Sequence, residues 1–190
     1  AGRTLEVDQE VYRSERETGH RNRAIGHLMR NFNMLTDDVD AVLDAYFCQC
    51  SVLVDCRDLS MIAATLANGG VNPVTGQRVL SAFYVRCVLS VMASCGMYDF
   101  AGQWAYKVGM PAKSGVSGGI IAVLPGQLGI GVFSPRIDAK GNTVRGIKVC
   151  EATAEHFGLH QFDAAPNARS IIRREARGNS ISSRRVRPLY

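Results

Sequence analysis

A short segment in the second half of the chain combines residue types that can do chemistry. Lys113-Ser114-Gly115-Val116-Ser117-Gly118-Gly119 carries a cation, two hydroxyls and three glycines, and it leads into an apolar run at 120–124. A Lys-Ser-Gly triplet at the start of a strand can place a cation and backbone N–H groups beside an acyl-transfer substrate. The glycines allow a ligand or another backbone to approach closely. The same pattern also fits a glycine-rich turn before a core strand, so the triplet alone leaves both interpretations open.

The elements that must position this segment are mostly helices. The spacing of apolar residues predicts helices over 12–31, interrupted by an exposed polar loop at 14–22, and over 39–54, 58–66, 81–94, 100–108 and 149–157. Asp38 and Ser81 are typical of helix starts, because their side chains can accept from free N–H groups. Gly96 is typical of a helix stop.

A change of apolar period after residue 111 predicts a β-hairpin. Its strands are residues 116–124 and 128–133, joined by 125–127, and a further turn is expected at 138–142. Many helices and one strand pair indicate an α+β fold, with helices packed on an antiparallel sheet. A sheet of two or three strands leaves edges that need covering, so this sheet is expected to be incomplete. The absence of an initial Met also favours a piece of a larger molecule.

Charge is unevenly distributed along the chain. The 190 residues are 46% hydrophobic and 21% charged, as in ordinary globular proteins. Residues 167–190 hold seven arginines and one acidic residue, so the basic excess lies there. We therefore divide the chain into a body, 1–165, and an arginine-rich tail, 166–190, that is expected to be flexible. Few aromatic residues lie in the tail, which makes binding to nucleic acid an unfavoured interpretation.

The sequence also excludes several other classes. It contains no apolar run long enough to span a membrane, and its first residues lack the apolar core of a secretory signal. The six cysteines form no Cys-x-x-Cys pair and are not interleaved with histidines at ligand spacing, so no metal is expected. Most cysteines lie in apolar segments, which predicts buried, reduced thiols and a cytoplasmic location.

Several motifs occur in a consistent order. They are Ser60-Met61-Ile62-Ala63-Ala64-Thr65-Leu66-Ala67-Asn68-Gly69-Gly70, Ser94-Cys95-Gly96-Met97-Tyr98-Asp99-Phe100, Pro111-Ala112-Lys113-Ser114-Gly115-Val116 and Gly118-Gly119. With these motifs, residues 14–163 closely resemble the serine-dependent glutaminase family. The resemblance implies a β-lactamase/transpeptidase-like fold and the hydrolysis of L-glutamine to L-glutamate and ammonia. It also implies a homo-oligomer with no cofactor and no metal.

The resemblance assigns substrate-binding roles to three residues near the N-terminus. Glu15 and Asn22 match the Glu and Asn of the family's Ser-Glu-x-Glu-x-Gly-x-Arg-Asn segment, which hold the α-amino and α-carboxylate groups of the substrate. A carboxylate can pair with an ammonium and an amide can donate to a carboxylate, so the residue types suit a zwitterion. Tyr46 matches a binding-site tyrosine. By pattern alone, Glu15 fits a solvated charge, Asn22 a helix cap and Tyr46 a core aromatic residue.

The resemblance assigns catalytic roles to a second group. Tyr98 matches the tyrosine beside the nucleophile, to which a proton-relay role is commonly assigned, and it also contacts substrate. Val116 matches the position whose backbone N–H helps to form the oxyanion hole, where one donor contributes roughly 3–4 kcal/mol of transition-state stabilisation. By pattern alone, Val116 fits a strand valine that faces the core. Lys113 is expected to support Tyr98, although it also fits a surface lysine before a strand.

The nucleophile of the family is absent from this chain. In the family a Ser-x-x-Lys segment supplies the attacking serine and the lysine that activates it. None of the lysines, at positions 107, 113, 140 and 148, lies three residues after a serine. Ser170 is followed at this spacing by Arg173, which stays protonated and cannot act as a base. The chain alone is therefore expected to be inactive and to need an N-terminal portion of the same enzyme as its partner.

Other functions remain open at this point. The chain fits a catalytically inactive fragment, or a binding or scaffold module that uses its basic tail for interaction. The retained residue types at positions 15, 22, 46, 98 and 116 argue against a module that has lost its pocket. A β-lactamase or transpeptidase role also fits the Lys-Ser-Gly triplet, although the segments around Pro111 and Tyr98 fit a glutaminase better.

Overall fold

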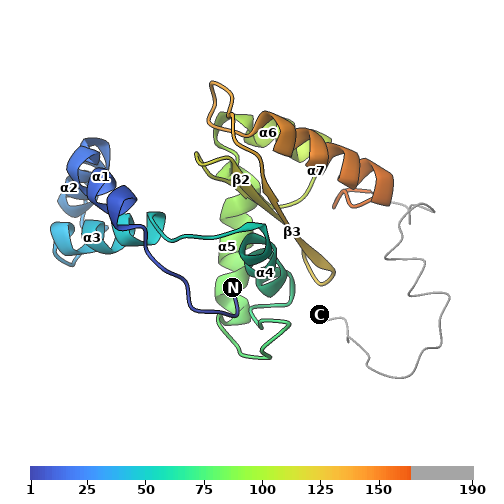
Figure 1. Ribbon diagram of the computed structural model, residues 1–190, viewed down its shortest axis with the longest axis horizontal. Helices are drawn as coiled ribbons and strands as arrows, with labels where there is room; N and C mark the ends of the chain where they lie inside the picture. Colours follow the sequence, from blue (N-terminus) through green and yellow to red (C-terminus); the bar gives the residue numbers. More distant parts are fainter. Residues whose placement is uncertain (164–190) are drawn as a thin grey trace. The chain divides into compact units, whose positions relative to one another are not determined.

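The computed structural model describes residues 1–163, and these belong to two compact units (Figure 1). One unit is Arg3–Val54, and the other begins at Asp55 and also includes Ala1–Gly2. The predicted arginine-rich tail, 166–190, lies outside the described residues. Each unit is described below by itself.

Three helices make up the Arg3–Val54 unit. They are α1 (Gln9–Thr18), α2 (His20–Asn31) and α3 (Val39–Cys50). Asp8 caps α1 and Asp38 caps α3, each through a side-chain oxygen that accepts from backbone N–H groups at the start of the helix. The small core consists of Val39, Leu43 and Phe47 on α3. These local signals place α3 where the sequence predicts it.

The prediction of a polar loop at 14–22 is wrong. These residues belong to α1 and α2, and only Gly19 interrupts the helices. A Cβ atom at Gly19 would lie 2.5 Å from Cζ of Phe47, so glycine is needed for the close approach of α3. The predicted end of α3 at residue 54 is also wrong. Ser51 ends the helix, its hydroxyl donating to the Phe47 carbonyl at 2.8 Å, and Val52 then pairs with Val7.

The second unit is built on a three-stranded antiparallel sheet. Its strands are β1 (Ala112–Ser114), β2 (Gly119–Leu124) and β3 (Leu128–Phe133), in the order β1-β2-β3. Its helices are α4 (Cys56–Ala67), α5 (Ala82–Cys95), the short 3₁₀ helix η1 (Tyr98–Phe100), α6 (Ala101–Lys107) and α7 (Val144–Phe157). The predicted α+β class, with helices packed on an antiparallel sheet, is confirmed.

Helices cover both faces of this sheet, with α4 and α5 on one side and α6 and α7 on the other (Figure 1). The side chains of β2 alternate between two cores, as expected for a strand buried on both faces. Ile120 and Ala122 belong to the core that contains Trp104 of α6. Val123 belongs to the core formed with Ala63 of α4. The middle strand is therefore the structural centre of the unit.

Glycines on β3 allow α4 to lie directly on the strand. A Cβ atom at Gly129 would be 2.1 Å from the backbone nitrogen of Ala64, and one at Gly131 would be 2.5 Å from that of Ser60. No side chain could be accommodated at these distances without moving the helix. The contact brings the helix backbone onto the sheet and seals one face of it.

Two predicted strand and helix boundaries are wrong in this unit. The hairpin is present, but β2 begins at Gly119 rather than at Val116, and residues 112–114 form a strand that was not predicted. Helix α7 begins at Val144 rather than near 149. Thr143 caps it, accepting from the Gly146 N–H at 3.1 Å and donating to the Ser134 carbonyl at 2.6 Å. The contact to Ser134, nine residues earlier in the chain, has no recognisable sequence signal.

All six cysteines are unpaired, but most are not buried. Cys150 is buried, Cys48 is half-buried, and Cys50, Cys56, Cys87 and Cys95 are exposed. The prediction of buried thiols is therefore wrong for most of them, because each apolar segment forms a helix that buries only one face. No helix within residues 1–163 is long and apolar enough to cross a membrane.

Candidate active site

The end of α5 lies against the first strand of the sheet. Beyond Cys95, Gly96 approaches Ala112 so closely that an added Cβ atom would be 1.8 Å from the Ala112 carbonyl oxygen. The backbone N–H of Ser114 donates to the Gly96 carbonyl at 3.0 Å. Gly96 therefore ends the helix, as predicted, and also allows close packing against β1. It lets η1, which begins at Tyr98, lie beside β1.

This contact brings Tyr98 and Lys113 together. The Nζ atom of Lys113 donates to the Tyr98 hydroxyl at 3.4 Å and lies 4.6 Å from the centre of the Tyr98 ring. Lys113 Nζ and the Tyr98 hydroxyl both donate to the carbonyl of Ser114. The Tyr98 side chain is 41% exposed. A phenol that solvent or substrate can reach, with a cation beside it, is suited to proton transfer.

Val116 lies in the turn between β1 and β2, and its side chain is 70% exposed. The interpretation of Val116 as a core valine is therefore wrong. Hydrogen bonds from Gly115 N–H to Gly119 O and from Gly118 N–H to Gly115 O, each 2.9 Å, define the turn. The Val116 N–H donates to no described residue.

A third segment, residues 138–142, lies against these two, and its sequence pattern predicts only a turn. A Cβ atom added at Gly141 would be 3.5 Å from Cε2 of Tyr98 and 3.9 Å from Cγ1 of Val116. The next residue, Asn142, is completely buried. The pattern Asp-x-x-Gly-Asn signals a turn, but nothing local indicates that this turn lies beside Tyr98.

Ser114, the middle residue of the Lys-Ser-Gly triplet, does not face solvent. Its side chain is 2% exposed, and its hydroxyl oxygen has no hydrogen-bond partner among the described residues. The chemistry of the triplet therefore belongs to the Lys113 side chain and to the backbone, including the Ser114 carbonyl that Tyr98 and Lys113 share.

The other three expected site residues belong to the Arg3–Val54 unit. Glu15 is on α1, Asn22 is on α2 and Tyr46 is on α3, and all are at least partly exposed. Tyr46 is 46% exposed, whereas the adjacent Phe47 is 1% exposed. The interpretation of Tyr46 as a core aromatic residue is therefore wrong, because Phe47 fills that place.

A polar contact holds together the two helices that carry Glu15 and Tyr46. The Tyr12 hydroxyl on α1 donates to Oδ1 of Asp44 on α3 at 2.5 Å, and Nε of Arg16 lies 3.7 Å from the same oxygen. The hydrogen bond to Asp44 raises the pKa of Tyr12, with smaller effects from burial and from the Asp44 charge. The nearby charge of Arg16 opposes the shift.

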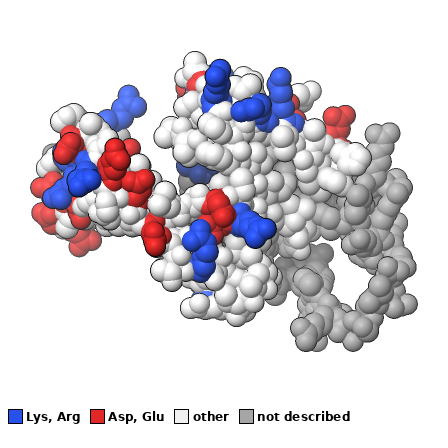
Figure 2. Space-filling view, in the orientation of Figure 1, with Lys and Arg blue, Asp and Glu red and all other residues white. Residues whose placement is uncertain are grey.

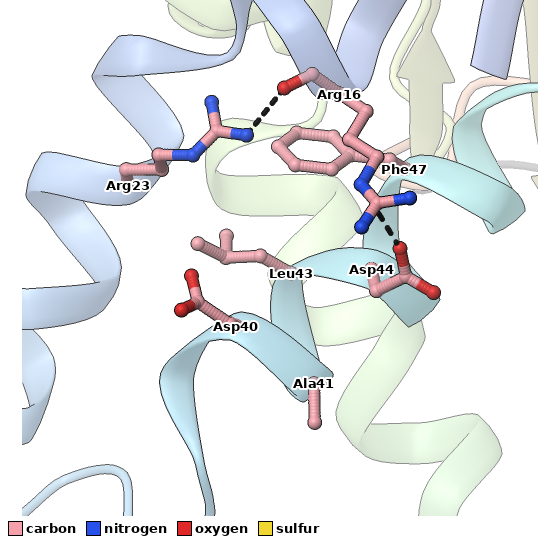
Figure 3. A pocket seen from close by; sticks show the side chains of 7 residues that line it. All are labelled: Arg16, Arg23, Asp40, Ala41, Leu43, Asp44 and Phe47. Carbon is pink, nitrogen blue, oxygen red and sulfur yellow. Dashed lines mark hydrogen bonds and ion pairs between the residues drawn. The ribbon is translucent and has the colours of Figure 1, made fainter. Parts of the chain in front are cut away.

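The same contact borders a cavity of about 530 Å³ (Figure 3). Arg23 donates to the Arg16 carbonyl there, and its guanidinium lies 5.6 Å from the centre of the Phe47 ring. The cavity is lined by Arg16, Arg23, Asp40, Ala41, Leu43, Asp44 and Phe47.

Acidic and basic side chains are interspersed on the surface of this unit (Figure 2). Within residues 1–163, no three His, Cys, Asp or Glu side chains gather at a metal site.

Comparison with solved structures identifies the class of fold. The crystal structure of Mglu matches with a TM-score of 0.80 and 48% identity, covering 87% of this chain and 42% of that one. The probable glutaminase YbaS matches with a TM-score of 0.81 and 45% identity, covering 84% and 52% respectively. The helices and the small antiparallel sheet are thus part of a β-lactamase/transpeptidase-like fold, as expected.

Comparison with sequences identifies the family. The Glutaminase family model matches residues 1–162. A glutaminase of Trichormus variabilis is 59% identical over 162 residues, which are 85% of this chain and 48% of that protein. Glutaminase 1 of Bradyrhizobium diazoefficiens is 54% identical over 187 residues, covering 98% and 30%. The chain belongs to the glutaminase family, and it spans about half or less of the length of these relatives.

Proposed function

We propose that this chain is part of an enzyme that hydrolyses L-glutamine to L-glutamate and ammonia. The observation that carries the proposal is the contact of Lys113 Nζ with the Tyr98 hydroxyl at 3.4 Å. The side chains of Tyr98 and Val116 both lie against Gly141, and the Val116 N–H donates to no described residue. Family membership supports the choice of reaction, and the related protein Mglu has been crystallised in a glutamate form.

Glu15, Asn22 and Tyr46 bind the substrate in this proposal. Glu15 pairs with the α-ammonium group, and Asn22 donates its amide N–H to the α-carboxylate. Tyr46, whose side chain is partly exposed, contacts the bound amino acid. The Tyr12–Asp44 contact supports these roles, because it ties the helix that carries Glu15 to the helix that carries Tyr46.

Hydrolysis proceeds through an acyl-enzyme. A serine hydroxyl attacks the side-chain amide carbon of glutamine, and the negative charge that develops on the amide oxygen is stabilised by the Val116 N–H. The proton of the serine hydroxyl passes through Tyr98 to the amide nitrogen, the C–N bond breaks, and ammonia leaves. The positive charge of Lys113 stabilises the charge that develops on the Tyr98 oxygen. Water cleaves the glutamyl ester, which releases glutamate and restores the serine.

The nucleophile comes from outside this chain, because none of its serines precedes a lysine by three residues. A portion that carries Ser-x-x-Lys is therefore the first partner of the chain, and we propose a homo-oligomer as the assembled form. A cytoplasmic location is part of the same proposal. It is supported by six unpaired cysteines, which are typical of a reducing compartment.

A chimera provides the test. In the chimera, the part of this chain that matches the Trichormus variabilis glutaminase over 162 residues replaces the matching part of that protein. The remainder of that protein stays in place. We expect the chimera to release ammonia from L-glutamine, and the chain by itself to release none. An inactive chimera that is folded, or a chain that turns over glutamine alone, would contradict the proposal.

A further inference from the structure

The turn next to Tyr98, residues 138–142, is held by its own hydrogen bonds. Oδ1 of Asp138 accepts from the N–H groups of Lys140 and Asn142, each at 2.9 Å. The Asp138 N–H donates in return to the Asn142 carbonyl at 2.8 Å. These bonds run through the backbone and the Asp138 side chain, and the side chain of Asn142 takes no part in them.

Asn142 uses its side chain to bind the segment that carries Tyr98. Its Nδ2 atom donates to the carbonyl oxygen of Met97 at 3.3 Å, across 45 residues of sequence. Asn142 is 0% exposed and Met97 is 1% exposed. The Met97 carbonyl also accepts from the Phe100 N–H at 3.1 Å, so loss of the Asn142 side chain removes the one of these two hydrogen bonds that ties η1 to the 138–142 turn. Water cannot easily replace it in the interior.

Tyr98 needs support of this kind because its backbone is strained. Its φ is +52°, in the left-handed region that bulky residues rarely adopt. Such conformations persist only where the surroundings hold them, and they gather at functional sites. The Ser114 carbonyl accepts from the hydroxyl end of Tyr98, Gly141 lies against the ring, and Asn142 holds the peptide just before it.

We propose that Asn142 is a positioning residue for Tyr98. It holds the peptide that leads from Met97 into Tyr98, and so keeps Tyr98 in the left-handed conformation in which the phenol meets Lys113. The proposal rests on the proposed function, in which Tyr98 transfers a proton. Loss of the Asn142 side chain therefore affects the chemical step through Tyr98 and leaves substrate binding largely intact.

Asn72 is a matched control in the same unit. It is 3% exposed, and its Oδ1 accepts from the N–H groups of Val74 and Thr75 within another turn. Replacing either asparagine by alanine removes a buried hydrogen-bonding group from a turn, so both changes lower stability. Of the two asparagines, Asn142 is the one whose side chain bonds to Met97, the residue before Tyr98.

The experiment compares Asn142→Ala, Asn72→Ala, Tyr98→Phe and Asn142→Ala/Tyr98→Phe in the active chimera. We expect Asn142→Ala to lower kcat roughly ten- to a hundredfold, because small displacements of a catalytic group have effects of this size. KM should change less than about twofold, and Asn72→Ala should leave kcat nearly unchanged. The double variant should be no slower than Tyr98→Phe, because both changes remove the same function.

Three results would overturn the proposal. They are an unchanged kcat in Asn142→Ala, an equal loss in Asn72→Ala, and losses from Asn142→Ala and Tyr98→Phe that multiply in the double variant. If Asn142→Ala does not fold, Asn142→Ser is judged by the same criteria. A folded but inactive wild-type chimera would instead count against the proposed function. In that case the position of Tyr98 is read from a crystal structure of the Asn142→Ser chain, where an unchanged Tyr98 backbone would exclude positioning.

Discussion

Lys113 Nζ lies 3.4 Å from the hydroxyl oxygen of Tyr98, although fourteen residues and the whole of α6 separate the two in the chain. The relationship depends on Gly96, which lets the end of α5 touch β1. The same backbone contact therefore joins a helix to the sheet and a phenol to a cation.

The first prediction concerns the Tyr98 hydroxyl. In the active chimera, Tyr98→Phe keeps the ring but removes the group that transfers the proton. We expect kcat to fall by a factor of roughly 10² to 10⁴, the usual contribution of general acid–base catalysis. Steady-state kinetics with L-glutamine measure the effect. Tyr106→Phe, at a tyrosine that is 85% exposed, serves as the control and should be neutral. A Tyr98→Phe variant with normal kcat would exclude the relay role.

The second prediction concerns the contact between α4 and β3. Gly129→Ala would place a methyl group 2.1 Å from the Ala64 backbone nitrogen, so the helix must move away from the sheet. We expect a loss of about 3 kcal/mol in the free energy of unfolding, at the upper end for overpacking. Urea unfolding of the chain measures it.

A second glycine provides the comparison. Gly102 is on α6, and nothing lies within 4 Å of an added Cβ atom there. Gly102→Ala should raise the free energy of unfolding by up to about 1 kcal/mol, because alanine favours helix more than glycine does. Equal effects at Gly129 and Gly102 would mean that α4 does not lie on β3 as described.

The third prediction concerns pH and the Tyr12–Asp44 contact. The hydrogen bond to Asp44 raises the pKa of Tyr12 above its ordinary value of 10.0 in the folded protein. The stabilisation is therefore complete below about pH 10 and is lost as the pH rises through the raised pKa of the folded state. We expect the stability advantage of the wild type over Tyr12→Phe to shrink at alkaline pH. Urea midpoints at several pH values measure it, and a constant difference would contradict the contact.

The fourth prediction concerns thiol reactivity. Burial, and to a smaller extent the charge of Glu151, raises the pKa of Cys150 to about 12. Near pH 8 this thiol is protonated and inaccessible, so iodoacetamide should not modify it in the folded chain. Exposed Cys87 and Cys95 should react promptly. Mass spectrometry of digested peptides measures the extent of modification. Rapid labelling of Cys150 without denaturant would show that its core is open.

Local signals explain the parts of the fold that were predicted correctly. Asp38 and Ser81 cap helices because their own side chains accept from N–H groups a few residues away, and this needs no distant partner. The hairpin of β2 and β3 likewise depends on neighbouring residues. Two predictions failed because they depend on contacts without a local signal. Gly19 makes room for Phe47, which is distant in the sequence. Thr143 bonds to Ser134, and neither residue belongs to a recognisable pattern.

The sequence alone determined the family, the residue types of the site and their order along the chain, because motifs such as Lys-Ser-Gly and Cys-Gly-Met-Tyr-Asp are local. Only the tertiary structure decided which of these groups are accessible and which meet. In the folded chain Ser114 is buried and Val116 is exposed. Tyr98 contacts Lys113, and the Asn142 side chain donates to the Met97 carbonyl. The reason is physical, since burial and contact arise when distant segments pack, and close packing depends on every surface that takes part.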